Sequence, residues 1–298
     1  MFGRSITLFH LLGFKVKADV SWLFLAALVT LSLASGYFPF RYPGLPQTLY
    51  WWMGVVGAIG LFASIIFHEL CHSLVARQYG MPIRGITLFI FGGVAEMEEE
   101  PPGAKAEFLM AVAGPISSGV LALAFFAVSG VAGGVGAPVS VTGVTDYLAF
   151  INFLLAAFNL VPAFPLDGGR MLRAALWHWK GDLRWATRIA ANAGGGFGFL
   201  LIALGLVNLL GGNWVGGIWY GLIGLFIRAA ASSSYMQMET RQVFEGEPVS
   251  RFMVRDPIVA PPDISVQQLV DEYVYGHHHE LFPVSGDSRL LGCVGVHE

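Results

Sequence analysis

Long stretches without any charged residue alternate along this chain with short charged segments. Charges are absent from residues 20–40, 42–67, 108–145 and 189–227, and from the run 147–166. A helix needs about 20 apolar residues to cross a bilayer, and the two longest runs are each long enough for two crossings joined by a turn. The pattern predicts six spans, near residues 20–37, 51–78, 108–130, 144–166, 188–210 and 214–231.

Two segments depart from this helical pattern. Residues 83–96 (IRGITLFIFGGVAE) are rich in β-branched and aromatic residues and are interrupted by Gly92-Gly93, which predicts one or two strands. Such strands must be sheltered by protein or lie at the membrane interface, because lipid does not tolerate open strand edges. After Arg228 the chain becomes polar and carries five prolines. We expect a membrane domain at 1–232, a linker at 233–244 and a small soluble domain at 245–298.

The composition agrees with this division. Of 298 residues, 55% are hydrophobic and 12% are charged, whereas soluble domains carry about 25% charged residues. The net charge of −3 and the lack of a basic stripe exclude a nucleic-acid binder. The two cysteines lie far apart, which argues against a disulfide framework. Basic residues precede the first apolar run as in a signal peptide, but no cleavage site follows, so we expect a retained span.

The basic residues also orient the spans. With the N-terminus placed in the cytoplasm, every Lys and Arg except Arg41 falls on the cytoplasmic side. A water-soluble all-helical protein, the alternative reading, has no reason to show this asymmetry. We therefore expect a membrane all-α protein with a small β-sheet, spanning the cell membrane several times, with both termini in the cytoplasm.

Three ionisable groups lie inside the second predicted span. His68 and His72 are four residues apart and share one helix face, with Glu69 beside them. Each ionisable group in a membrane costs about 2.5–3.5 kcal/mol and marks a functional site. Two imidazoles at this spacing can bind one Zn²⁺ with the glutamate as a general base. Three unrelated polar residues, the alternative, would leave that cost without compensation.

A catalytic zinc usually has three protein ligands and an open position. Asp167 ends the fourth predicted span, and the charge pattern places it near the same membrane face as the histidines. Pro162 and Pro165 break the helix before it, and Gly168-Gly169 permit unusual backbone angles. The alternative is an ordinary helix-end carboxylate paired with a nearby arginine.

HELCH (68–72) together with NLVPAFPLDGG (159–169) resembles the site-2 protease family of intramembrane zinc metalloproteases, over about residues 10–232. The resemblance implies that His68, His72 and Asp167 hold zinc and that Glu69 activates water. It also implies that Asn159 positions substrate or stabilises the oxyanion. Ala113-Gly114-Pro115 matches too, but the family often has asparagine where this chain has Ser118, so no polar role is assigned to Ser118.

The strand segment resembles the membrane-associated sheet of this family, which can pair with an unwound substrate. The residues expected to contact that substrate are Ile86, Leu88, Ile90, Gly92, Gly93 and Val94. The soluble tail resembles a CBS domain, through the order of 249–253, 256–259, 282–284 and 290–294. Such domains work in pairs and commonly bind adenine nucleotides. Only one repeat is present and it looks truncated, so we expect a longer protein or a homodimer that completes the pair.

The function expected is therefore that of a zinc metalloendopeptidase of the site-2 protease type. It would cut a peptide bond in or near a transmembrane segment of a protein substrate within the lipid bilayer. The alternative is a zinc-binding membrane protein without protease activity, either a metal transporter or a nucleotide-sensing scaffold. Glu69 favours the protease, because neither alternative needs a base beside the metal.

Overall fold

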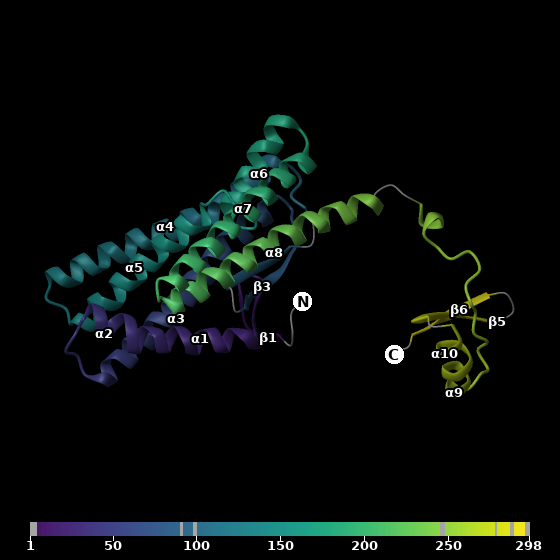
Figure 1. Cartoon of the computed structure of the whole chain (residues 1–298), viewed down its shortest axis with the longest axis horizontal. Coiled ribbons are helices and arrows are strands. Elements are labelled where there is room, and N and C mark those ends of the chain that lie inside the picture. Colours follow the sequence, from purple (N-terminus) through teal and green to yellow (C-terminus); the bar gives the residue numbers. More distant parts are fainter. Residues whose placement is uncertain are drawn as a thin grey trace. The chain divides into compact units, whose positions relative to one another are not determined.

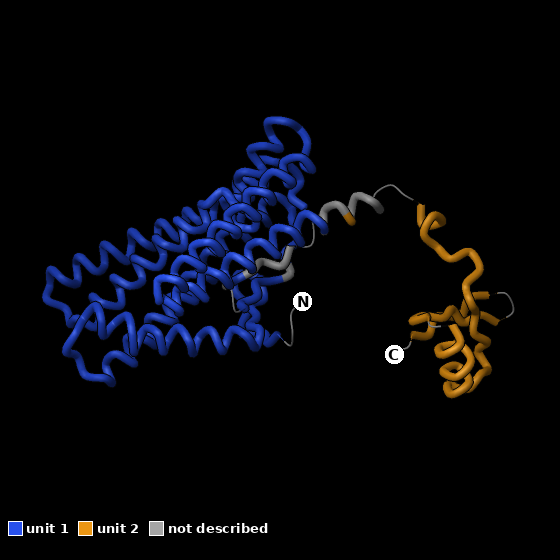
Figure 2. The backbone as a smooth tube through the Cα atoms, in the orientation of Figure 1, with its two compact units in different colours: residues 1–239 blue, residues 240–298 orange. Residues whose placement is uncertain are grey.

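The computed structural model describes residues 5–89, 92–97, 100–244, 248–277, 279–286 and 289–295. The chain forms two compact units, Met1–Glu239 and Thr240–Glu298 (Figure 2). Ile90, one of the predicted substrate contacts, lies outside the described residues.

The first unit contains four strands and the long helices (Figure 1). In chain order they are β1 (Ser5–Leu11), β2 (Phe14–Asp19), α1 (Val20–Ser32), η1 (Leu33–Tyr37), α2 (Phe38–Arg41), α3 (Gln47–Gln78), β3 (Ile83–Phe89), β4 (Gly92–Met97), α4 (Ala104–Gly134), α5 (Val139–Asn159), α6 (Asp167–Lys180), α7 (Leu183–Leu210) and α8 (Trp214–Phe244).

Among the described residues, six helices are long and apolar enough to cross a membrane, as the sequence predicts. The first is formed by α1, η1 and α2 together, and the others are α3, α4, α5, α7 and the first part of α8. The predicted fourth span is wrong at its end: α5 stops at Asn159, and Asp167 begins the separate short helix α6. Pro162 and Pro165 lie in the turn between them and cannot continue a helix.

The four strands form one sheet in the order β1-β2-β3-β4. β1 and β2 make an antiparallel hairpin, β2 pairs with β3 in parallel, and β3 pairs with β4 antiparallel. The sheet packs on α3 through a buried cluster of Phe14, Leu70 and Ile86. Because Leu70 lies between the two histidines of α3, this packing places the sheet beside the candidate site.

The helices form two packed layers, one away from the sheet and one nearer to it. Figure 1 shows α4 and α5 side by side, and α3 packs against both. Away from the sheet, aromatic and aliphatic side chains from η1, α2, α3 and α5 form the largest apolar cluster, which includes Phe38, Met53 and Tyr147. Nearer the sheet, α6 packs against α4 and α7. This second layer carries Asp167.

The second unit is small. It contains η2 (Val249–Arg251), α9 (Val266–Gln268), η3 (Leu269–Val274), α10 (Tyr275–His277), β5 (Leu281–Gly286) and β6 (Arg289–Gly295). β5 and β6 pair antiparallel, and Ala260 forms a parallel bridge to Val284. The predicted linker 233–244 is helical, as the end of α8. The predicted domain boundaries stay a prediction.

Candidate active site

Two histidines of α3 and the first residue of α6 meet in the interior of the first unit. The Nε2 atoms of His68 and His72 are 3.1 Å apart, and each is 3.1 Å from Oδ2 of Asp167. His68 is 3% exposed and His72 8%. Three donor atoms in an equilateral triangle are therefore enclosed by protein, and one of them is carried by a different helix from the other two.

The outer nitrogens of both imidazoles have partners on α4. His72 Nδ1 donates to the carbonyl oxygen of Met110 at 2.7 Å, and His68 Nδ1 lies 2.8 Å from the hydroxyl of Ser118. A carbonyl can only accept, so His72 carries its proton on Nδ1, and we assign the same tautomer to His68. Both Nε2 lone pairs then point to the centre of the triangle.

The donor set fits zinc. Donors at the corners of a tetrahedron with bonds of about 2.0–2.1 Å lie about 3.3 Å apart, close to the separation of these three atoms. Without a cation, two imidazole lone pairs and a carboxylate would face one another at short range and repel. Among the described residues, these three also form the group of His, Cys, Asp or Glu side chains able to hold a metal ion.

Asp167 is placed by close packing of the turn that precedes it. A Cβ atom on Gly168 would collide with the carbonyl oxygens of Leu160 and Val161, and one on Gly194 of α7 would collide with that of Phe164. Gly168 has no positive φ, contrary to the unusual angles that the sequence suggested. Its role is to let the turn fold back onto α6.

Burial favours the neutral form of Asp167, but protonated imidazoles beside it would outweigh burial through charge and hydrogen bonds and hold the pKa of Asp167 well below its usual range. A metal ion that displaces those protons then meets an ionised carboxylate.

An ion pair joins α6 to α4 nearly two turns beyond Asp167. Arg173 Nη2 lies 2.5 Å from Oε1 of Glu107, and Arg173 Nε donates to the same oxygen at 2.6 Å. Glu107 is fully buried and Arg173 is 6% exposed. Arg173 Nη2 also lies 3.4 Å from Glu100. Among the described residues, Asp167 forms an ion pair with neither Arg170 nor Arg173, so the alternative of a helix-end carboxylate paired with one of these arginines is not what the structure shows.

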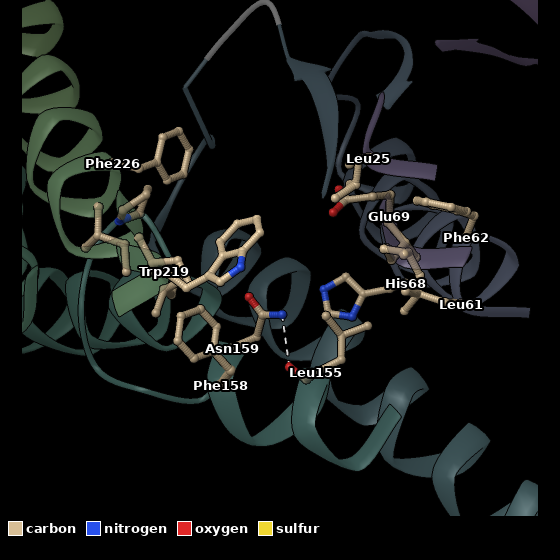
Figure 3. Close-up of a pocket in the computed structure, with 17 residues that line it drawn as sticks. Leu25, Leu61, Phe62, His68, Glu69, Leu155, Phe158, Asn159, Trp219 and Phe226 are labelled. Carbon is tan, nitrogen blue, oxygen red and sulfur yellow. Dashed lines mark hydrogen bonds between the residues drawn. The ribbon is translucent and has the colours of Figure 1, made fainter. Parts of the chain in front are cut away.

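Two cavities meet at these residues. The larger, about 380 Å³, is lined mainly by apolar side chains of α1, α3, α5 and α8, such as Phe62 and Trp219. The smaller, about 220 Å³, includes His72, Asp167 and Arg170. Both are lined by His68, Glu69 and Asn159. Figure 3 shows these three side chains around the larger cavity, with Trp219 facing them.

Glu69 lies beside the triangle, outside it. A Cβ atom on Gly93 of β4 would come within 2.9 Å of Glu69 Cγ, so the absence of a side chain there lets β4 pass against the glutamate. Asn159 ends α5, and its amide donates to the carbonyl oxygen of Leu155 at 3.0 Å. Glu69 and Asn159 are both near the donor triangle, as the sequence anticipated for its site residues.

The predicted substrate contacts divide between two strands. Ile86 and Leu88 belong to β3, are at most 1% exposed, and lie in a strand that pairs with neighbours on both sides. Gly92, Gly93 and Val94 belong to β4, the last strand of the described sheet. Of these two strands, only β4 lies at an edge of the described sheet, whose other edge is β1. A further strand that pairs beside the predicted contacts would therefore pair with β4, since the backbone of β3 is already used.

Neither partner of the outer imidazole nitrogens was predicted from the sequence, and Ser118 is the one that contributes a side chain. It is fully buried and 50 residues from His68 in sequence. The family often carries a polar asparagine three residues after Pro115, and this position was the signal that the sequence offered. Because this chain has serine there instead of asparagine, no polar role was assigned to it.

Six membrane helices around a buried cluster of two histidines and an aspartate, with a glutamate at the junction of two cavities, define a membrane-embedded metalloprotease. The sequence model of Peptidase family M50 matches residues 56–142 and 130–203. The chain is 40% identical over 295 residues to Rip3 of Mycobacterium tuberculosis, described as a candidate zinc metalloprotease, covering 99% of this chain and 75% of that one.

Other relatives agree. Zinc metalloprotease MJ0392 of Methanocaldococcus jannaschii is 31% identical, and the alignment covers 98% of this chain and 78% of that protein. The solved structure of a site-2 protease from Methanocaldococcus jannaschii matches with a TM-score of 0.52 and 28% identity, over 77% of this chain and 94% of that one. The chain belongs to peptidase family M50 and is an intramembrane zinc metalloprotease, which acts on membrane proteins within a lipid environment.

Replacing Ser118 with alanine should weaken zinc binding by about 10–100-fold, the usual effect of losing an outer partner of a metal ligand. The His68 ring would keep its buried N–H but lose the acceptor that orients it. Competition with a fluorescent chelator at equilibrium measures the affinity. Ser117→Ala is the matched control, because the Ser117 hydroxyl donates to Gly114 within its own helix. Equal losses in both variants would show general destabilisation instead.

Proposed function

We propose that His68, His72 and Asp167 hold the zinc ion of this protease and that Glu69 is its general base. The observation that carries the proposal is the triangle of 3.1 Å separations, built from donor atoms whose lone pairs converge. The rival, a zinc-binding membrane protein without protease activity, would not need Glu69 at the edge of both cavities.

The zinc ion supplies a bound water with a pKa of about 7 and polarises the carbonyl to be cut. The residues of the chain do the rest. Glu69 accepts the proton from water and delivers it to the nitrogen of the departing amine. Asn159, at the junction of the cavities, presents an amide group that can hold the peptide or donate to the oxygen that becomes negative. The apolar side chains of the larger cavity exclude bulk water from one side.

The substrate strand would lie along β4. A helical segment hides its peptide groups, so it must unwind before cleavage, and an unwound strand can pair with a sheet edge. Gly93 brings β4 close to Glu69, which supports this position. Ile86 and Leu88 then support the sheet from inside it.

Removal of the metal is the most direct test of this function. A designed transmembrane peptide with a fluorescent reporter should be cut by the protein in detergent. Dialysis against a chelator should abolish cutting, and about one equivalent of zinc per chain should restore it. Cleavage that persists in metal-free protein would contradict the proposal.

The orientation of the chain is part of the proposal. Both termini lie in the cytoplasm, as the distribution of 17 lysines and arginines supports. The active site then lies toward the cytoplasmic face, because His68 and His72 belong to the last part of α3.

The second unit, we propose, is a CBS-type repeat that pairs with a second copy, giving a homodimer that binds an adenine nucleotide. The order of its elements supports this, as do exposed apolar side chains such as Val254, Val266 and Leu290, each more than 60% exposed.

The nucleotide should bind only to the completed pair. Titration of ATP or AMP into a strictly monomeric sample of this chain, followed by calorimetry, should give weak binding or none. Full-length chains held together as a dimer, so that their two 245–298 segments can pair, should bind the nucleotide. Tight binding by the monomer would contradict the pairing.

A further inference from the structure

Two arginines on α6 are in different electrostatic situations. Arg173 is buried and its guanidinium contacts both Glu107 and Glu100. Arg170, one turn earlier, is half-buried and lines the smaller cavity together with Asp167. Among the residues that the structure describes, no carboxylate forms an ion pair with Arg170. Arg170 therefore faces the active-site cavity without an ion-pair partner among the described residues.

The two cavities differ in chemistry. The larger one is bounded by side chains such as Leu25, Phe62 and Leu155 (Figure 3), and the ionisable groups that line it are those of the site itself. The smaller one adds His72, Asp167 and Arg170. Both cavities include Glu69 and Asn159. A substrate bound across the site therefore has the residues on one side of the cleaved bond among apolar side chains and those on the other side beside Arg170.

An arginine keeps its charge in proteins, and its planar guanidinium matches a carboxylate with two parallel hydrogen bonds. In a cavity partly shielded from water such a bond is stronger than at an open surface. A substrate carboxylate on the polar side of the site would give Arg170 an ion-pair partner, which none of the described residues provides. A lysine in the same place would be repelled.

We propose that Arg170 selects substrates that carry Asp or Glu beside the cleaved bond, on the polar side of an apolar segment. This deepens the proposed function and rests on it. The acidic residue lies within about four residues of the cleaved bond, because each extended residue spans about 3.3 Å and the cavity is small. The substrate class is thus a transmembrane segment with an acidic residue at its end.

The test uses three designed transmembrane peptides that differ at one polar-side position, carrying Glu, Gln or Lys. Wild-type protein should cut the Glu peptide with a kcat/KM about tenfold or more above the Gln peptide, with Lys lowest. Arg170→Gln should remove the preference, and Arg170→Glu should favour the Lys peptide. Arg184→Gln is the matched control: it removes an exposed positive charge outside both cavities and should keep the wild-type order.

A binding measurement separates recognition from chemistry. In the Glu69→Gln background, which should not turn over, fluorescence anisotropy with labelled peptides gives dissociation constants. Adding Arg170→Gln should weaken binding of the Glu peptide about tenfold and leave the Gln peptide unchanged. If the Arg170 variants fail to fold, the wild-type protein alone tests the proposal. Its preference for the Glu peptide over the Gln peptide should decline with added salt.

Equal cutting of the Glu and Gln peptides by wild-type protein would overturn the proposal. So would Arg170→Gln lowering cleavage of all three peptides by the same factor, because that would mean a general effect on Glu69. Failure of the underlying function looks different: wild-type protein would then cut none of the peptides with or without zinc.

Discussion

Replacing Glu69 with glutamine should leave about one zinc per chain and lower the rate of cleavage by about 10²–10⁴-fold, the usual contribution of a general base. Glutamine keeps the shape of the side chain against Gly93 but cannot accept a proton. The triangle of His68, His72 and Asp167 does not include Glu69, so the metal has no reason to leave. Zinc is measured by elemental mass spectrometry on purified protein, and cleavage with a designed transmembrane peptide.

Glu272→Gln is the control for this change, since it removes an exposed carboxylate in the second unit and should alter neither zinc content nor rate. Loss of zinc together with activity in Glu69→Gln would mean that Glu69 is a ligand. Full activity would mean that another group accepts the proton. Either result would refute the role assigned to Glu69.

Replacing Asp167 with alanine should weaken zinc binding by more than the 10–100-fold typical of an outer partner, and cleavage should be lost. Two imidazoles alone leave a catalytic zinc one ligand short. Asp167→Asn should keep part of the affinity, because an amide oxygen is a neutral and weaker donor. In a zinc-loaded crystal structure, an Asp167 oxygen should lie about 2.0–2.2 Å from the metal and the histidine nitrogens about 2.0–2.1 Å.

Asp182→Asn provides the comparison, since Asp182 also stands at a helix start, capping α7 by accepting from the Trp185 amide, yet lies outside both cavities. It should bind zinc like the wild type. Asp167→Ala protein with wild-type zinc occupancy and cleavage would refute the assignment of Asp167 as the third zinc ligand. So would a structure in which the Asp167 side chain turns away from bound zinc.

Much of the membrane domain was readable from the chain because bilayer crossing imposes a simple rule on composition. Uncharged runs of 20 residues or more cannot be hidden in loops, so all six spans were found. The meeting of Asp167 with the histidines was also readable, since charge asymmetry fixes the membrane face at which each span ends. The exact end of α5 was not, because residues 160–166 are as apolar as the helix before them.

Two features could not be read because they depend on long-range pairing. The hairpin of β1 and β2 was not predicted, and its alignment with β3 joins residues such as Val16 and Ile86 that are far apart in sequence. The contact of Ser118 with His68 likewise spans 50 residues. The sequence does not show which side chain a serine in an apolar helix will contact.

The separation of the site along the chain has a consequence for biosynthesis. Asp167 follows the two histidines by 95 and 99 residues, and it reaches them only when α6 docks on α4 through Arg173 and Glu107. With His68, His72 and Asp167 as the proposed zinc ligands, a chain whose first three spans have been inserted holds both histidines and the glutamate but no complete metal site. We therefore expect the nascent enzyme to be latent until its fourth span and α6 are in place, so that unfinished chains do not cut neighbouring proteins at the translocon.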